Sequence, residues 1–322
     1  MSYSYSGNFK QYIEGLIEQK QSVGYPYQSS ARILRKFDEY CKKYFPDEQA
    51  LSREIVMGWA SLKPDEHPNG LLRRVTPVRQ LAKYMNSIGI ESYVIPPKVP
   101  KKQIRYVPHI YTANELEAFF HSLDMCQPSP FSLGRHLVIP VFFRLLYCCG
   151  LRSSEARLLS MHDVDLDEGS LFIRQSKGHK DRMVYLSADL ILLCRTYNIQ
   201  ISLYYPDREV FFPNQQGSFY NDSIVDYWFH LFWDDLAVAG ICVGNIPRVH
   251  DFRHTFAVNR LNLWVREGKD INAYLPYLSI YLGHVNQADT DYYLHLVPEF
   301  FPVLKEKSRT VFEELIPEAH YE

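Results

Sequence analysis

The sequence predicts a mainly α-helical protein with one small antiparallel β-sheet, an α+β chain divided into two domains. Its 322 residues are roughly twice the length of an average domain. Apolar residues recur at three- and four-residue spacing over most of the chain, as they do on one face of a helix. Residues 164–186 instead alternate in polarity around two glycines, which is typical of two or three short strands.

Composition excludes several classes of protein. Hydrophobic residues make up 46% of the chain, which argues against a mostly disordered protein. No run of 18 apolar residues occurs and residues 1–10 are polar, so we expect no membrane span and no secretory signal. The six cysteines are scattered and form no C-x-x-C pair. They indicate a reducing compartment, and we therefore expect a cytoplasmic protein.

Four helices are predicted in the N-terminal part of the chain. Apolar residues recur at helical spacing over four segments, residues 9–17, 33–41, 54–59 and 70–87. Ser52 is the expected start of the third helix, and Gly89 is expected to end the fourth. Pro77 lies inside the fourth helix, where we expect a kink or a late start.

Charge is unevenly distributed. The net charge is −2, yet residues 1–107 hold 17 Lys and Arg against 10 Asp and Glu, while residues 108–322 hold 18 against 27. Because phosphate binding depends on local positive charge, the basic half is a candidate DNA-binding surface; an ordinary solvated basic face explains the split equally well. The candidate DNA-binding residues are Arg73, Arg74, Arg79, Lys83, Lys98, Lys101 and Lys102.

A basic, proline-rich segment separates the two predicted domains. Residues 95–105 contain three prolines, which oppose helix formation and favour an extended path. We therefore predict a helical domain over residues 1–93, a linker over 94–109 and a second domain over 110–322. The second domain should begin with a capping box at Thr112 and Glu115, and continue with an apolar helix over 137–149 that Gly150 ends. A short helix is expected over 155–162, and mostly helices from Ser187 onward.

Four short motifs in the second domain carry side chains suited to chemistry on phosphate. They are the stretches CGLRSSE (149–155), SKGHKDR (176–182), HDFRH (250–254) and LGH (282–284), the last followed by YLH (293–295). Taken singly, each has an ordinary explanation: a boundary arginine is usually a surface residue, a turn lysine is usually solvated, and a tyrosine is usually a packing residue.

Together these residue types fit a site that activates a phosphodiester. An arginine can clamp a phosphate with two parallel hydrogen bonds, as Arg152 would after Gly150. His250 and Arg253 are three residues apart and would share one helix face. Tyr293 is a poor nucleophile at the ordinary pKa of a phenol, but neighbouring cations favour the phenolate.

In this order and spacing, the motifs resemble the tyrosine recombinase (phage integrase) family, in its simple two-domain form found in mobile elements or in the Xer proteins. The resemblance covers about residues 110–300, and residues 1–90 look like the family's core-binding domain. It implies a phosphate-activating set, a nucleophile and a supporting acid: Arg152, Lys177, His250, Arg253 and His284, then Tyr293, then Glu155. Three features depart from the family pattern: Ala156, Tyr185 and the 31 residues from Arg253 to His284.

The resemblance also implies an activity and partners. Such an enzyme is a site-specific recombinase that closes on DNA as a C-shaped clamp and rejoins strands through a 3′-phosphotyrosyl bond and a Holliday junction. We expect no cofactor, no metal and no ATP. The expected partners are duplex DNA with inverted-repeat core sites, three further copies of the chain in a tetramer, and, where direction is controlled, an accessory factor. The protein would be nucleoid-associated. No arm-binding domain is expected before residues 1–90.

Some alternatives remain at this stage. A type IB topoisomerase would use similar chemistry on one strand. A metal hydrolase would use the histidines, but no H-E-x-x-H spacing occurs. A catalytically dead DNA-binding module conflicts with the intact motif set. The C-terminal segment, residues 299–322, is amphipathic at its start and would dock on a neighbouring protomer or on its own domain. Tyr292 competes with Tyr293 as nucleophile, and the Tyr-x-His ending at His295 favours Tyr293.

Overall fold

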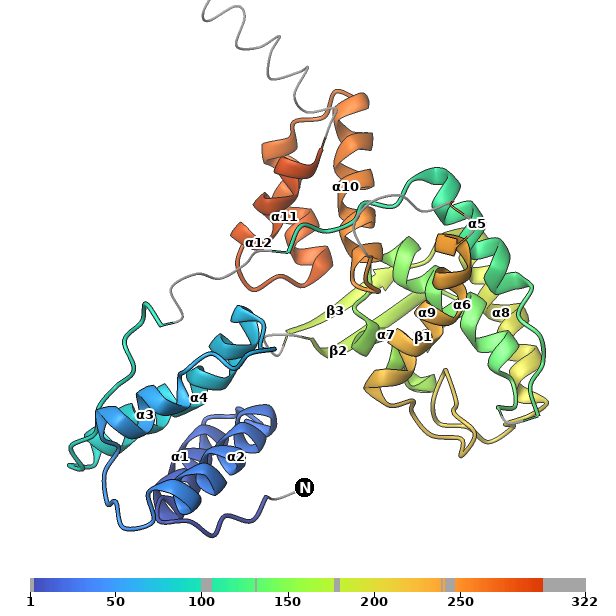
Figure 1. Cartoon of the computed structure of the whole chain (residues 1–322). Helices are drawn as coiled ribbons and strands as arrows, with labels where there is room; N and C mark the ends of the chain where they lie inside the picture. Colours follow the sequence, from blue (N-terminus) through green and yellow to red (C-terminus); the bar gives the residue numbers. More distant parts are fainter. Residues whose placement is uncertain are drawn as a thin grey trace, which may run out of the picture. The chain divides into compact units, whose positions relative to one another are not determined.

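The computed structural model divides the chain into two compact units, Met1–Tyr106 and Val107–Glu322. It describes residues 3–99, 106–130, 132–176, 180–238, 240 and 247–297 (Figure 1). The predicted α+β class is confirmed, since helices dominate and one small antiparallel sheet is present. In the part of the chain that the structure describes, no helix is both long and apolar enough to cross a membrane.

The N-terminal unit is a group of helices around one apolar core. Its helices are α1 (Lys10–Ser22), α2 (Gln28–Tyr44), α3 (Arg53–Trp59) and α4 (Pro68–Ser87). Ser52 caps α3 as predicted, because its hydroxyl accepts a hydrogen bond from the backbone of Ile55 at 3.3 Å. Helix α4 starts at Pro68 and continues through Pro77, which is buried. The four helices bury Phe9, Leu34, Phe37, Ile55, Val78 and Leu81.

The segment predicted as a linker is partly built into this unit. Ile95 has no exposed surface and belongs to the core of the helices. The guanidinium of Arg79 donates hydrogen bonds to the carbonyls of Ile95, Pro96 and Val99, at 2.9, 3.0 and 2.8 Å. The N-terminal unit therefore extends past residue 93, because apolar burial and arginine contacts hold the proline-rich stretch against α4.

The second unit contains most of the helices and the sheet. Its helices are α5 (Ala113–Asp124), α6 (Arg135–Cys149), α7 (Ser153–Arg157), α8 (Ala188–Ser202), α9 (Asp222–Val238), α10 (Asp251–Arg266), α11 (Ile271–Leu282) and α12 (Ala288–Asp291), with short 3₁₀ helices η1 (Met161–Asp163) and η2 (Tyr292–Leu296). The strands β1 (Val164–Asp165), β2 (Ser170–Ser176) and β3 (Lys180–Tyr185) pair antiparallel in the order β1-β2-β3, with Leu171 opposite Val184.

Helix α6 lies at the centre of this unit's core and leads to the candidate site. Its side chains Phe142 and Phe143 are fully buried among the aromatic rings of α5, α9 and α10. Gly150 ends α6 with a φ of 60°, a left-handed conformation that glycine adopts without strain. A Cβ at this position would meet the ring of Phe256 at 2.6 Å. The chain can therefore turn tightly into the next motif.

Two predicted helical stretches are shorter or tighter than expected. The predicted helix over 155–162 is wrong in its extent, because α7 ends at Arg157. Ser160 then precedes the short η1, and its hydroxyl donates a hydrogen bond to the carboxylate of Asp163 at 2.7 Å. The run from Ala288 to Leu296 starts as α12 and continues as the 3₁₀ helix η2. Tyr293 lies in η2 and packs with α10 and α11 in a second apolar cluster of this unit.

Candidate active site

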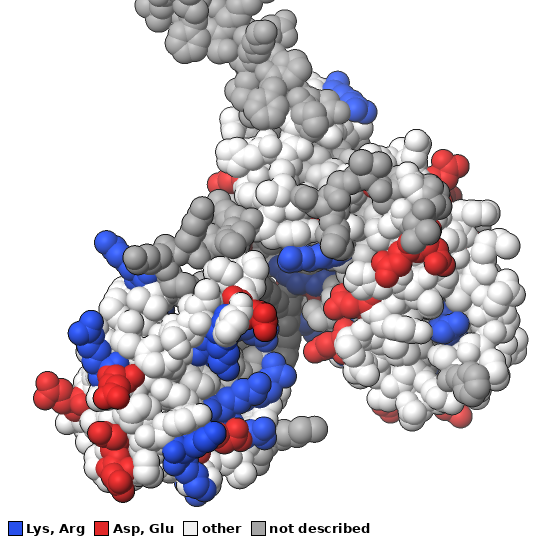
Figure 2. All heavy atoms as spheres, in the orientation of Figure 1, with Lys and Arg blue, Asp and Glu red and all other residues white. Residues whose placement is uncertain are grey.

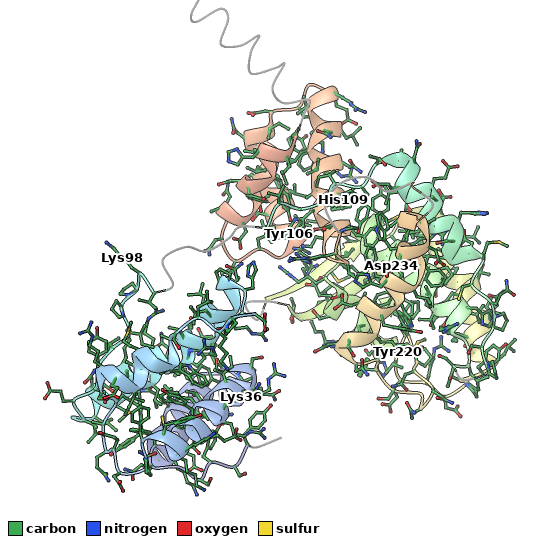
Figure 3. All side chains as sticks on the ribbon, viewed as in Figure 1. Lys36, Lys98, Tyr106, His109, Tyr220 and Asp234 are labelled. Carbon is green, nitrogen blue, oxygen red and sulfur yellow. The ribbon has the colours of Figure 1, made fainter. Side chains whose placement is uncertain are left out.

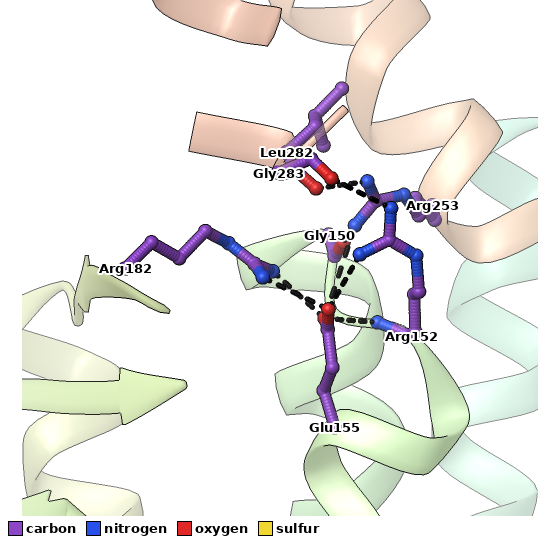
Figure 4. A network of polar contacts seen from close by, with 7 residues as sticks. All are labelled: Gly150, Arg152, Glu155, Arg182, Arg253, Leu282 and Gly283. Atoms are coloured by element: carbon purple, nitrogen blue, oxygen red, sulfur yellow. Dashed lines mark hydrogen bonds and ion pairs between the residues drawn. The ribbon is translucent and has the colours of Figure 1, made fainter. Parts of the chain in front are cut away.

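Arg152 occupies the turn between α6 and α7, where the C-G-L-R motif predicted a catalytic arginine. Its guanidinium donates to the Glu155 carboxylate at 2.6 Å and to the backbone carbonyl of Gly283 at 3.0 Å (Figure 4). Its backbone N–H donates to the same carboxylate at 2.9 Å. The first and last of the four predicted motifs therefore meet at one guanidinium group, although 131 residues separate them.

Glu155 is the acidic centre of a cluster of arginines. The carboxylate accepts hydrogen bonds from both terminal nitrogens of Arg182, at 2.9 and 2.8 Å, as well as from Arg152. A terminal nitrogen of Arg253 lies 4.0 Å from it. Glu155 is 9% exposed, so its charge is stabilised mainly by these guanidinium groups rather than by water. Three positive charges surround one negative charge, which leaves a net positive site.

Arg253 is the most deeply buried charged group of the site, at 1% exposure on α10. Its terminal nitrogens donate to the carbonyls of Gly150, at 2.7 Å, and of Leu282. Burial, together with the neighbouring charge of Arg152, lowers the pKa of Arg253 to about 10, so the group stays protonated at neutral pH. The backbone at the ends of α6 and α11 therefore fixes the position of this charge.

His284 and Thr290 form a hydrogen-bonded pair beside the arginines. The Nδ1 of His284 lies 2.6 Å from the hydroxyl of Thr290, which is fully buried. Burial and the charges of Arg253 and Arg152 lower the pKa of His284 to about 3. The imidazole is therefore neutral at pH 7, and its hydrogen bond with Thr290 decides which ring nitrogen carries the proton.

Tyr293 lies inside this group of side chains. It is 2% exposed, and its ring centroid is 6.1 Å from that of His284 and 5.5 Å from that of His254. Burial raises the pKa of the phenol, while interaction with Arg253 and the charge of Arg152 lower it. The neighbouring Tyr292 is less buried and packs on the apolar cluster of α10 and α11. The ring of Tyr293 thus lies beside two histidines of the site.

Two histidines at the start of α10 complete the described site. His250 directly precedes the helix, and its ring packs edge-to-face on His254 with centroids 4.9 Å apart. The pKa of His254 is lowered to about 4 by burial and by the charge of Arg253. The pKa of His250 is lowered too, because the protein around the ring displaces water and because His254 and Arg253 are close. Both rings are therefore neutral at pH 7.

The arrangement is suited to binding an anion next to a nucleophile. The arginines and neutral imidazoles supply N–H donors, and the phenol of Tyr293 supplies an oxygen that can attack. Among the described residues, no group of three or more His, Cys, Asp or Glu side chains is placed to hold a metal ion. Lys177, the predicted lysine of the hairpin, lies outside the described residues, between the end of β2 and the start of β3.

The residues predicted to bind DNA fall into two groups. Arg74 is held inside the N-terminal unit: it donates to Glu66 at 2.9 and 2.6 Å and lies over the ring of Trp59. Arg79 is likewise engaged with the backbone after α4. Arg73 and Lys83 are exposed on α4, and Lys98 is exposed beyond it (Figure 3). Lys101 and Lys102 lie outside the described residues.

On the face drawn in Figure 2, the N-terminal unit carries charges of both signs, and its Lys and Arg side chains lie among Asp and Glu side chains. Of the candidate residues on α4, Arg73 and Lys83 remain the exposed ones, and they stay predictions as DNA contacts.

Comparison with known proteins decides the family. A model of the phage integrase family matches residues 111–299, more than half of the chain. The chain belongs to this family, the tyrosine recombinases. A protein described as an integrase/recombinase, y4rB of Sinorhizobium fredii, is 30% identical over 94% of this chain and 96% of its own length. The tyrosine recombinase XerA of Thermococcus kodakarensis is 28% identical over 90% and 93% of the two chains.

Solved structures share the fold of this tyrosine recombinase. XerH bound to palindromic difH substrate, in a post-cleavage complex, matches with a TM-score of 0.60 at 21% identity over 92% of this chain and 83% of its own. A lambda integrase dimer bound to a core site matches with a TM-score of 0.60 at 13% identity, over 88% and 94%. The family and the fold class predicted from the motifs are confirmed.

Three residues of the recombinase's site escaped the sequence reasoning. Arg182 stands within one of the quoted motifs, yet an arginine on a strand carries no signal of its own. His254 stands in the HDFRH motif without an assigned role, and the structure places its ring beside that of Tyr293. Thr290 is one threonine in a polar stretch. Its only available signal was its position six residues after His284, across the turn that leads into α12.

Proposed function

We propose that this recombinase breaks and rejoins duplex DNA at a specific site by using Tyr293 as a covalent nucleophile. The observation that carries this proposal is the position of the phenol, which is buried against His284 and His254 and interacts with Arg253. When a phosphate enters the site, the guanidinium groups around the buried phenol stabilise the negative charge that develops on the phosphate during attack.

In the cleavage step, the phenol oxygen of Tyr293 bonds to the scissile phosphorus and the bond from phosphorus to the 5′ oxygen breaks. The product is a 3′-phosphotyrosyl bond and a 5′-hydroxyl. Arg152 and Arg253 neutralise the non-bridging oxygens, with His250 and His284 as further donors. Lys177 supplies the proton for the departing 5′ oxygen. Attack of a 5′-hydroxyl on the phosphotyrosyl bond reverses these bond changes and rejoins the strand.

The phenol proton needs an acceptor, because burial raises the pKa of Tyr293 and the resting side chain is protonated. The rings of His284 and His254 lie beside the phenol ring, and we propose that one of these imidazoles takes up the proton once the negative charge of the bound phosphate has raised its pKa. The energy of the broken phosphodiester stays in the phosphotyrosyl bond. The reaction therefore requires no ATP, and the positive side chains take the role that a metal ion has in other phosphoryl transfers.

The assembly is part of the proposal. Recombination joins two duplexes, so four copies of the chain would act on inverted-repeat core sites through a Holliday junction. A surface cavity of about 400 Å³ on the catalytic unit is lined mainly by aromatic and apolar side chains of α10 and α11, among them Phe256, Trp264, Tyr277 and Tyr281. Residues 299–322 include Phe300, Phe301, Val311 and Phe312. We propose that this segment of a neighbouring copy occupies the cavity.

The function is tested with a nicked suicide duplex that carries inverted repeats found beside the protein's own gene. The released 5′ fragment diffuses away, so cleavage leaves a covalent protein–DNA adduct that migrates as a band on a denaturing gel. We expect the band with the wild-type protein in the presence of EDTA, and none with Tyr293→Phe. A band that EDTA abolishes, or that Tyr293→Phe retains, would overturn the proposal.

The assembly is tested separately by replacing Tyr277, which is 69% exposed and lines the cavity, with Lys. We expect the variant to cleave an isolated half-site at the wild-type rate but to lose the tetrameric complex on two full sites in native gels. Tyr25→Lys is the matched control, since Tyr25 is also exposed but belongs to the N-terminal unit. Unchanged tetramer formation by Tyr277→Lys would show that the cavity is not the docking site.

A further inference from the structure

Arg182 is a buried arginine with no role in the predicted catalytic set. It lies on β3 opposite Ile173 of β2, and its side chain is 7% exposed. Both of its terminal nitrogens bind Glu155, one to each carboxylate oxygen, at 2.9 and 2.8 Å (Figure 4). This is the two-bond geometry in which a guanidinium fixes both the position and the orientation of a carboxylate.

The carboxylate that Arg182 fixes is also the partner of Arg152. Glu155 accepts from the side chain of Arg152 at 2.6 Å and from its backbone at 2.9 Å. The two arginines thus approach Glu155 from different elements, β3 and the turn before α7. If Arg182 were absent, the carboxylate would keep Arg152 and, at 4.0 Å, Arg253 as its cationic neighbours. It would then lose the two-bond pairing across the hairpin, and only its contacts with Arg152 and Arg253 would set its position.

We propose that Arg182 is a positioning residue for DNA cleavage: it holds Glu155 in one orientation, and Glu155 in turn holds Arg152 where the scissile phosphate binds. The proposal rests on the proposed function, since it assigns Arg152 to the phosphate. It gives a role to a buried arginine of β3 whose carboxylate partner is already paired with another arginine. A displacement of about 1 Å in a catalytic group is enough to cost about 100-fold in rate.

The first test compares single-turnover cleavage by Arg182→Gln and Arg182→Lys with a matched control. Arg174→Gln is that control, because Arg174 also lies on the hairpin, on β2, and pairs with an acid, Asp163, away from the site. We expect Arg182→Gln to cleave about 10–100-fold more slowly, with DNA affinity within about twofold of wild type. Arg182→Lys keeps the charge but not the fork, so it should recover only part of the rate. Arg174→Gln should cleave normally.

A double-mutant cycle tests whether Arg182 acts through Glu155. In a Glu155→Gln background, the further change Arg182→Gln should lower the cleavage rate by less than about twofold, because the link is already broken. Independent, multiplicative losses would contradict the proposal. Circular dichroism and thermal melting of each variant identify any loss that comes from unfolding, and Arg182→Lys provides the readout if Arg182→Gln fails to fold.

Chemically altered substrates distinguish two possible roles of the β2–β3 hairpin in cleavage: proton donation by Lys177 and positioning of Glu155 by Arg182. A 5′-sulfur leaving group departs without a proton, so it should restore cleavage by Lys177→Ala but not by Arg182→Gln. A methylphosphonate at the scissile position carries no charge on the non-bridging atoms, so it should reduce the difference between Arg182→Gln and wild type to about threefold.

Restoration of Arg182→Gln by the sulfur substrate would mean that Arg182 acts through the hairpin lysine, and the proposal would be wrong. Wild-type cleavage by Arg182→Gln would also overturn it. Failure of the proposed function is recognised independently, because Tyr293→Phe or Arg152→Ala would then still cleave in the same assay. If those two variants are inactive and Arg182→Gln is normal, only the positioning role fails.

Discussion

The ring of Tyr293 stacks on the imidazole of His284, with centroids 6.1 Å apart and planes inclined by 23°. Tyr293 is almost fully buried, and Nδ1 of His284 is hydrogen-bonded to the hydroxyl of the buried Thr290. The phenol is thus placed in a fixed position relative to Arg253 and Arg152, whose charges favour its ionised form. The structure therefore presents an organised site.

Arg152→Ala should separate DNA binding from cleavage. Arg152 belongs to the site, whereas the excess of Lys and Arg lies in residues 1–107, so loss of its charge should leave DNA affinity nearly unchanged. The loss of one set of charge-assisted donors should reduce the cleavage rate by about 10²–10³-fold. Single-turnover cleavage and gel-shift titration of the same protein check this. Equal cleavage rates for variant and wild type would remove Arg152 from the phosphate site.

Arg253→Ala should differ from Arg152→Ala by also destabilising the protein. The buried carbonyls of Gly150 and Leu282 would lose their donors, and Glu155 would lose a nearby positive charge. We expect the free energy of unfolding to fall by roughly 2–5 kcal/mol, measured by denaturant titration. Arg152→Ala is the comparison, because Arg152 is less buried. An unfolding free energy equal to wild type for Arg253→Ala would contradict the described hydrogen bonds.

Thr290→Val should impair cleavage without removing any group that touches DNA. The substitution keeps the shape of the side chain and removes the hydroxyl that bonds to Nδ1 of His284. The tautomer and ring orientation of His284 would then be unfixed, and we expect a loss of about tenfold in cleavage rate. Thr290→Ser retains the hydroxyl and should restore most of the rate. If Val and Ser variants cleave equally, the hydroxyl has no role.

The buried histidines should make the folded protein less stable at mildly acidic pH. The pKa of His284 is about 3 in the folded state, while an unfolded histidine titrates near its ordinary value of about 6.5. Between these two values the unfolded chain binds the proton and the folded chain does not, so stability falls as pH falls below about 6.5. His284→Gln should therefore lose less stability than wild type between pH 7 and pH 5, by about 2 kcal/mol.

Denaturant titrations of both proteins at the two pH values measure this difference. His162→Gln is the control, since His162 lies in η1 and outside the site. The same pH dependence in wild type and His284→Gln would mean that His284 is charged or solvated in the folded protein.

The basic residues of the N-terminal unit should divide into two groups. Neutralising the exposed Arg73, Lys83 and Lys98 should weaken binding to any DNA sequence and reduce the slope of log affinity against log salt by about 0.9 per lost phosphate contact. Arg74→Ala should instead lower the melting temperature, because it removes the pair with Glu66 and the contact with Trp59. An unchanged salt slope in the triple variant would show that these side chains do not contact phosphate.

The sequence predicts which residues of the candidate site lie together where their proximity depends on local spacing. Arg152 with Glu155, and His250 with Arg253, are three residues apart, so a single turn of chain brings each pair together. The helix caps at Ser52 and Thr112 are predicted for the same reason, and both are present.

Contacts between distant segments were beyond such reasoning. The spacing of the arginines on α4 predicts that they face solvent. Arg79 instead donates hydrogen bonds to backbone carbonyls 16 to 20 residues later. Arg182 pairs with Glu155 across 27 residues, and Arg152 reaches Gly283 across 131. Only the folded chain shows that these groups meet, because neither periodicity nor capping patterns encode which long side chain finds a distant carboxylate or carbonyl.

The identity of the covalently modified residue tests the central claim most directly. The wild-type protein is trapped on the suicide duplex, digested with nuclease and protease, and the peptide spanning Tyr292 and Tyr293 is sequenced by mass spectrometry. We predict that the nucleotide remnant is carried on Tyr293, that Tyr292→Phe forms the adduct normally, and that Tyr293→Phe binds DNA without forming it. A remnant on Tyr292, or an adduct formed by Tyr293→Phe, would contradict the account.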